Sequence, residues 1–286
     1  MNNIYDIYQT VNFIVDKVRN GYITPEEFSK AIDVGQTSKY QNYINEYRAG
    51  SEFAMEALRP FFTHTSLTSS VSGLVTYPDD FGYLQNAYVS QNGVEYAIFE
   101  ILHDELEYYT SSKISPLSST NVKLIQEGVG CQLYPKRKIT AEYHYISKPT
   151  TPELIYTTDG VTITPIVGTG YSVIVNSISG GAIAGFTYNS PMGSGFIDGS
   201  YTDIPIIGGS GTGATCDMIV VNGSVLSTSP SNGGTGYVIG DVVTIDSSVE
   251  LGFDKQFWVE IMNEALKYIG LNLSNQELLQ VMAQQK

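Results

Sequence analysis

The sequence has few of the residues that build reactive or metal-binding centres. It contains two cysteines, three histidines and one tryptophan among 286 residues. Cys131 and Cys216 show no CxxC spacing, which excludes a disulfide-rich scaffold and a cysteine zinc site. The histidines, His64, His103 and His144, are too few and too scattered for most metal constellations. We therefore expect neither a cofactor nor a metal ion.

Long apolar runs and positive charge are also scarce. No run of eighteen apolar residues occurs, so we expect no membrane span. The chain carries 15 basic and 29 acidic side chains, for a net charge of −14. A protein that grips nucleic acid through its phosphates needs the opposite balance. With 21 tyrosines and 28 glycines, the composition instead favours sheets and assembly surfaces.

Residues 156–249 have a composition of their own. They contain six Asp but no Glu, Lys or Arg, and they hold 18 of the 28 glycines. The segments on either side, 1–155 and 250–286, resemble each other in charge content. A distinct segment between two similar ones indicates an inserted domain. We therefore expect residues 1–155 and 250–286 to form one core and residues 156–249 to form a domain inserted into it.

Periodicity predicts helices at both ends of the chain and short strands between them. Apolar residues from Ile4 to Val18 follow helical spacing, and Thr24 with Glu27 has the pattern of a capping box. Asn92-Gly93 has the pattern of a tight hairpin turn. The expected fold class is α+β, with a core of helices and a small antiparallel sheet and an inserted all-β domain that is sandwich- or barrel-like. The expected helices cover residues 4–20, 24–48, 52–62, 103–112, 253–269 and 275–284, and the expected strands cover 74–77, 87–89, 96–99, 131–135 and 139–145.

The glycine-rich segment contains an internal repeat. Gly168-Thr169-Gly170 recurs as Gly211-Thr212-Gly213, 43 residues later, and Gly193-Ser194-Gly195-Phe196 recurs as Gly234-Thr235-Gly236-Tyr237. Each copy carries β-branched runs. The pattern predicts two duplicated all-β units packed as one small sandwich or barrel, because two copies are too few to close a propeller.

Two motifs suggest chemistry, and each has a simpler structural interpretation. Residues 16–27 partly match a calcium-binding loop, but Val18 at its third position offers no side-chain oxygen. A helix end at Gly21 and a capping box at Thr24 explain the same residues. The acids in His103-Asp104-Glu105-Leu106-Glu107 do not face each other across a cleft, so we interpret them as a solvated helical turn.

The only run of consecutive basic residues is Lys136-Arg137-Lys138. An exposed hairpin turn is the simpler interpretation, and contact with DNA or with an acidic partner surface is the alternative. No G-x-S-x-G elbow, P-loop or complete dinucleotide fingerprint occurs in the chain.

Three stretches resemble structural proteins of short-tailed phages of the crAss-like type. The first runs from Tyr5-Asp6-Ile7-Tyr8 to Pro25-Glu26-Glu27-Phe28, the second from Leu133-Tyr134-Pro135 to Thr150-Thr151-Pro152, and the third from Phe257-Trp258 to Glu277-Leu278. The glycine-rich segment is similar to β-repeats of phage virion proteins, including fibres and baseplates, through Gly195–Tyr201 and Gly233–Val243. The resemblance implies a head–tail connector, that is, an adaptor or ring protein.

Such a connector would be a structural virion protein and not an enzyme. The resemblance implies a ring of identical subunits at the phage neck, commonly twelve copies, made in the host cytoplasm. Its partners would be further copies of itself, the portal protein, further tail or ring proteins, and DNA that passes without sequence-specific binding. The candidate subunit- or portal-interface residues are Lys136, Arg137, Lys138, Phe253, Phe257, Trp258, Ile261, Leu271, Leu273, Leu278, Leu279 and Met282.

Two alternatives stay open. The protein could be a tail-fibre or adhesin subunit that binds host glycan through exposed tyrosines of the β repeats. It could also be a virion enzyme that degrades the cell wall, although no convincing pair of facing carboxylates stands out in the sequence.

Overall fold

The structure is a computed structural model that describes residues 3–158, 163–245 and 247–271. The chain forms two compact units. Unit 1 combines residues 1–39 with residues 150–286, and unit 2 consists of residues 40–149. The division falls inside a long helix, at Lys39 and Tyr40. Residues 273, 278, 279 and 282, together with the helix expected over 275–284, lie outside the described residues.

The expected fold class is wrong in its balance of helix and sheet. The described residues are 43% strand and 28% helix, with two nearly closed sheets and five α-helices. A helical core with a small sheet is therefore excluded. The error arises in residues 62–147, where strands such as Phe62–Thr68 only half-bury the threonine and leucine side chains of one face. Such strands give a weak apolar alternation, so the sequence pattern underestimates them.

The helices begin and end close to where their capping residues predict. The Thr24 Oγ1 accepts a hydrogen bond from the Glu27 N–H, and the Glu27 carboxylate accepts one from the Thr24 N–H, which confirms the capping box. Asn20, not Gly21, takes the left-handed conformation that ends the first helix, with φ of 49°. The α-helices are α1 (Ile4–Arg19), α2 (Pro25–Arg48), α3 (Glu52–Leu58), α4 (Leu106–Ser111) and α5 (Trp258–Tyr268).

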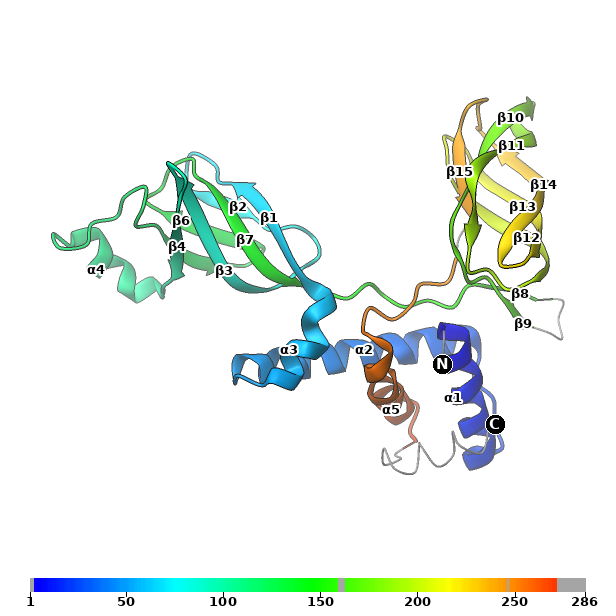
Figure 1. Cartoon of the computed structure of the whole chain (residues 1–286), viewed down its shortest axis with the longest axis horizontal. Coiled ribbons are helices and arrows are strands. Elements are labelled where there is room, and N and C mark those ends of the chain that lie inside the picture. Colours follow the sequence, from blue (N-terminus) through cyan, green and yellow to red (C-terminus); the bar gives the residue numbers. More distant parts are fainter. Residues whose placement is uncertain (1–2, 159–162, 246, 272–286) are drawn as a thin grey trace. The chain divides into compact units, whose positions relative to one another are not determined.

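Unit 2 is built on a seven-stranded sheet (Figure 1). Its strands follow the order β1-β7-β3-β4-β5-β6-β2, and every neighbouring pair is antiparallel except β4 and β5. The β3–β4 hairpin turns at Asn92 and Gly93, both with positive φ, as the sequence predicts. The strands are β1 (Phe62–Thr68), β2 (Leu74–Thr76), β3 (Phe81–Gln91), β4 (Val94–Glu100), β5 (Lys123–Glu127), β6 (Gly130–Tyr134) and β7 (Thr140–Ser147).

Unit 1 contains a six-stranded antiparallel sheet in the order β11-β10-β15-β12-β13-β14 (Figure 1). The two end strands also meet, because the Thr228 N–H donates to the Tyr188 Oη across 3.0 Å, and the sheet thereby approaches a barrel. A two-stranded ribbon, β8 (Tyr156–Thr158) with β9 (Ile163–Pro165), precedes it. The six strands are β10 (Thr169–Ser179), β11 (Ala182–Ser194), β12 (Gly199–Gly208), β13 (Thr212–Val221), β14 (Ser224–Thr235) and β15 (Val242–Ile245), and they are called the β module below.

The internal repeat is confirmed by matching contacts in the β module. After β11, the Phe196 N–H donates to the carbonyl of Gly223, in the β13–β14 hairpin. After β14, the Tyr237 N–H donates to the carbonyl of Gly181, in the β10–β11 hairpin. Each copy thus closes on the turn of the other copy, and the two aromatic rings occupy equivalent buried places in the core.

Candidate functional site

The basic run lies in the connection between β6 and β7. Lys136, Arg137 and Lys138 are all exposed, which agrees with the interpretation as a turn. A second segment is hydrogen-bonded to this turn, because the Ser69 Oγ donates to the carbonyl of Arg137 across 2.8 Å and accepts from the Ile139 N–H. The turn is therefore a fixed feature of unit 2.

The apolar interface candidates that the structure describes lie inside the chain. Five side chains are buried within unit 1: Phe253, Phe257, Trp258, Ile261 and Leu271. The Trp258 indole donates to the carbonyl of Phe253 across 2.7 Å, so its polar atom is also satisfied internally. These residues stabilise the packing of α5, and their role at an interface stays a prediction.

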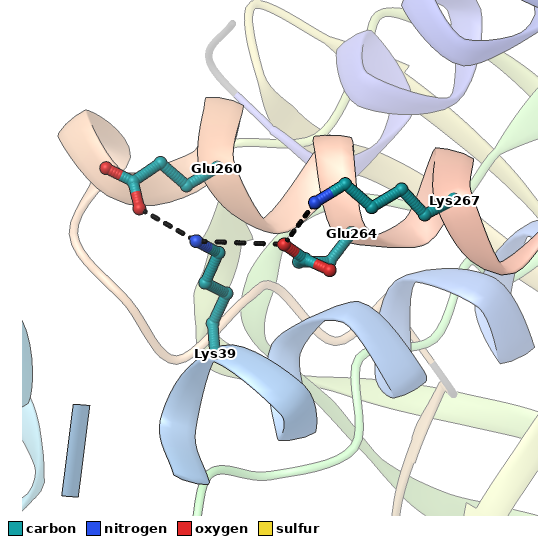
Figure 2. Close-up of polar contacts among 4 residues, drawn as sticks. All are labelled: Lys39, Glu260, Glu264 and Lys267. Carbon is teal, nitrogen blue, oxygen red and sulfur yellow. Dashed lines mark hydrogen bonds and ion pairs between the residues drawn. The ribbon is translucent and has the colours of Figure 1, made fainter. Parts of the chain in front are cut away.

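Charged side chains hold α5 on α2 (Figure 2). The Lys39 Nζ lies 3.1 Å from a Glu260 carboxylate oxygen and 3.9 Å from one of Glu264. Glu264 also pairs with Lys267, one turn along α5, at 2.9 Å. The Lys39 side chain is only 19% exposed, so this contact is screened less than an ordinary surface pair. The sequence offered no signal for it, since the partners lie more than 200 residues apart.

A projecting segment joins β4 to β5, and we call its residues 101–117 the arm. Parallel neighbours need a crossover connection, and the arm supplies it with a 3₁₀ turn at His103–Glu105 followed by α4. Figure 1 shows α4 set apart from the strands of unit 2. The sequence predicted the short helix but not the parallel pairing that requires an arm.

A buried lysine anchors the base of the arm. The Lys123 Nζ lies 4.7 Å from the ring centroid of Phe99 and 4.8 Å from that of Tyr109. Burial lowers the pKa of Lys123, and the faces of two aromatic rings stabilise its charged form. Leu106 and Leu117 of the arm pack against an apolar cluster of the sheet. The side of the arm that faces the sheet is therefore held in place.

The described histidines and acids do not assemble a metal site. His64 lies directly opposite His144 in the sheet, with ring centroids 5.5 Å apart, and the Glu142 carboxylate lies 3.9 and 3.5 Å from their Nε2 atoms. No group of three or more His, Cys, Asp or Glu among the described residues has an arrangement that could hold a metal ion. The pairing is an electrostatic feature of the sheet surface.

Neither cysteine is placed as a nucleophile. Cys131 and Cys216 are both buried and reduced. Burial raises the pKa of the Cys131 thiol, and it raises the pKa of Cys216 to about 12. Both thiols stay protonated near neutral pH, and a thiol reacts as its thiolate.

Two of the hollows in unit 1 are lined partly by residues of its helices. One has a volume of about 440 Å³ and brings Glu26, Asp33 and Lys30 together with residues 151–156. Tyr156 donates a hydrogen bond to Glu26 and lowers the pKa of that carboxyl, whereas burial raises the pKa of Asp33. The other hollow, of about 350 Å³, has a lining that includes Val15, Ile23, Tyr268, Ile269 and Leu271.

Comparisons with known protein families and with curated proteins found no match. No model of a known protein family matches the sequence, and no curated protein is detectably similar to it. Within the part of the chain that the structure describes, no helix is both long and apolar enough to cross a membrane.

Proposed function

We propose that the protein is a structural virion protein that forms a ring at the neck of a short-tailed phage. In this role it joins the portal to the tail and lines the passage for DNA. The resemblance of the segments within residues 5–28, 133–152 and 257–278 to crAss-like connector proteins supports the proposal.

The observation that carries the proposal is the distribution of exposed apolar side chains. They occur on several different elements of both units, whereas a protein with one ligand-binding cleft would have most of them at that cleft. A subunit with several protein neighbours needs contact surfaces of this kind. The clusters are Phe53 and Met55 on α3, Leu102, Tyr108 and Ile114 on the arm, and Ile219, Val221 and Leu226 on β13 and β14.

The net charge of −14 agrees with a passage for DNA. An acidic wall repels the phosphate backbone and so disfavours its adsorption. The β module contributes to this balance, since residues 156–249 contain no lysine and no arginine.

The adhesin alternative receives less support from the tyrosines of the β module. Tyr171, Tyr201 and Tyr237 are buried in its core, and Tyr188 is the exposed one among the strands. Glycan-binding proteins present their aromatic rings to the sugar, so buried rings contribute to stability instead of recognition.

Electron microscopy of intact virions tests the proposal. The label is a gold-conjugated antibody against the exposed β13–β14 hairpin of the full-length protein. We expect gold at the neck, directly below the capsid vertex that carries the portal. Label at the fibre tips or at the distal end of the tail would overturn the connector proposal and favour the adhesin.

A further inference from the structure

The outer side of the arm carries large apolar side chains that nothing in unit 2 covers. Leu102 is 67% exposed, Tyr108 is 71% exposed and Ile114 is 98% exposed. Because the inner side of the arm is anchored by Lys123 and the apolar cluster, this exposure is a property of the folded unit. Exposed apolar groups of this size in a short segment mark a contact surface.

The arm is also acidic. Asp104 and Glu107 lie in the same segment as these apolar side chains. The carboxylate of Glu105 already accepts a hydrogen bond from the Leu102 N–H, across 2.9 Å. Neither Asp104 nor Glu107 forms an ion pair with another described residue. Their charges are therefore available to a partner.

A second surface of unit 2 has the complementary character. Lys136, Arg137 and Lys138 are exposed and form no ion pair with any residue that the structure describes. The neighbouring segment, held to this turn through Ser69, exposes Val71 to 83% and also exposes Leu74. We call Val71, Leu74 and residues 136–138 the basic surface.

We propose that the arm of one copy docks on the basic surface of the next copy. The acids of the arm then face the lysines and the arginine, and the apolar side chains of the two surfaces cover each other. The two surfaces consist of different residues of the same unit, so the contact is heterologous and passes from copy to copy. Contacts of this type close into a ring when the rotation between copies permits it.

The inference rests on the proposed function, because a ring requires a repeating contact, and it assigns that contact to named residues. The apolar groups supply most of the affinity, and the exposed charge pairs add a smaller attraction that also sets the register. We therefore expect self-association to weaken as the salt concentration rises.

Charge reversal on the full-length protein tests the contact. The arm variant is Asp104→Lys with Glu107→Lys, and the surface variant is Lys136→Glu with Lys138→Glu. Sedimentation equilibrium should show self-association weakened about tenfold or more in each variant, because each places like charges at the contact. Glu105 is left unchanged, since it caps the turn at Leu102.

Combining the reversals gives the sharper result. A chain with all four substitutions restores opposite charges, and so does an equimolar mixture of the two variants. Both should recover association close to that of the wild type. The matched control, Asp79→Lys with Glu95→Lys, changes the net charge as much as the arm variant does, at exposed residues outside both surfaces. It should associate like the wild type.

A carbodiimide, which joins a lysine amine directly to a carboxylate with loss of water, identifies the contact itself. A mixture of isotope-labelled and unlabelled wild-type chains should yield cross-links from Asp104 or Glu107 of one copy to Lys136 or Lys138 of another. A wild-type chain that stays monomeric, or variants that associate without loss, would overturn the inference. If gold labels the neck but this contact is absent, the inference is contradicted and the proposed function stands. If the contact forms but gold does not label the neck, the proposed function is contradicted and the contact stands.

Discussion

The sheet of unit 2 and the β module both approach closure, but different residues stabilise them. The seven-stranded sheet packs large rings: Tyr77 stacks on Phe81 with ring centroids 3.7 Å apart, and Tyr143 is fully buried beside them. The β module relies on glycine. Gly168 lies against the Phe196 ring and Gly211 against the Tyr237 ring, where a Cβ atom would approach ring atoms within 2.6 Å.

The comparison shows two ways to build a curved sheet with little charge inside. In unit 2 the packed volume of the side chains specifies the curvature, so a lost side chain should be the most harmful change. In the β module the backbone approaches aromatic rings closely, so an added methyl group should be the most harmful change.

The largest effect should come from Leu133→Ala in unit 2. Leu133 is fully buried in the core of the sheet, and its truncation leaves a cavity. We expect a loss of about 3 kcal/mol in the free energy of unfolding of unit 2. Hydrogen exchange followed by mass spectrometry should show faster exchange in residues 62–147 and unchanged exchange in the β module. Val94→Ala, at an exposed position of the same sheet, serves as the control and should change little.

The reverse experiment adds a methyl group to the β module. In Gly211→Ala the new Cβ would lie 2.3 Å from a Tyr237 ring carbon and 2.6 Å from the carbonyl oxygen of Thr235. We expect the free energy of unfolding of the β module to fall by about 2 kcal/mol. Hydrogen exchange should become faster only within residues 169–245. Gly199→Ala is the matched control, because its Cβ meets nothing within 4 Å. Equal effects of the two substitutions would contradict the role of close approach.

How far the sequence predicts these features depends on the range of the interaction. The capping box at Thr24, the turn at Asn92-Gly93 and the repeat of the β module follow from neighbouring residues, and the structure confirms each. The strand Phe62–Thr68 and the parallel pairing of β4 with β5 depend on partners far away in the sequence. Local patterns do not carry that information.

The candidate site shows the same limit. The exposure of residues 136–138 follows from their charge, and the sequence singled them out. Val71, which lies close to that turn through a long-range hydrogen bond of Ser69, carries no local signal. The spacing of the apolar stripe from Phe253 to Ile261 fits either a buried helix face or a subunit interface, and the structure shows these side chains buried within the chain.

A smaller effect should follow from removing the charge that joins α2 to α5. Lys39→Met leaves Glu260 and Glu264 as neighbouring acids one turn apart, without their shared partner. We expect the free energy of unfolding to fall by about 1 kcal/mol, since this ion pair is only partly buried. The fluorescence of Trp258, the only tryptophan, reports the unfolding of α5. Lys267→Met is the control, because Lys267 is 42% exposed and pairs within its own helix. Lys267→Met should lower the free energy of unfolding by less than half as much as Lys39→Met does.

The smallest effect should be a gain in stability, at the place where the chain leaves the β module. Burial raises the pKa of Glu250, and its Oε2 has no hydrogen-bond partner among the described residues. As the pH rises from about 4.5, the ordinary value, through the raised pKa, the folded chain must release a proton that it binds more tightly than the unfolded chain does. The free energy of unfolding therefore falls over this interval.

Glu250→Gln removes that fall and keeps an acceptor for the Ile4 N–H, which the carboxylate now binds. We expect the variant to be more stable than the wild type at pH 7 and equally stable at pH 4, measured by Trp258 fluorescence during denaturation. The control is Glu153→Gln, because Glu153 is exposed and its backbone forms a bridge with that of Val249. It should leave the pH profile unchanged. If the Glu250 variant gains stability while hydrogen exchange in the β module stays the same, the segment that follows the β module belongs energetically with the helices. A gain shared by the β module would instead show that this segment, with its bridge between Glu153 and Val249, is energetically part of the module.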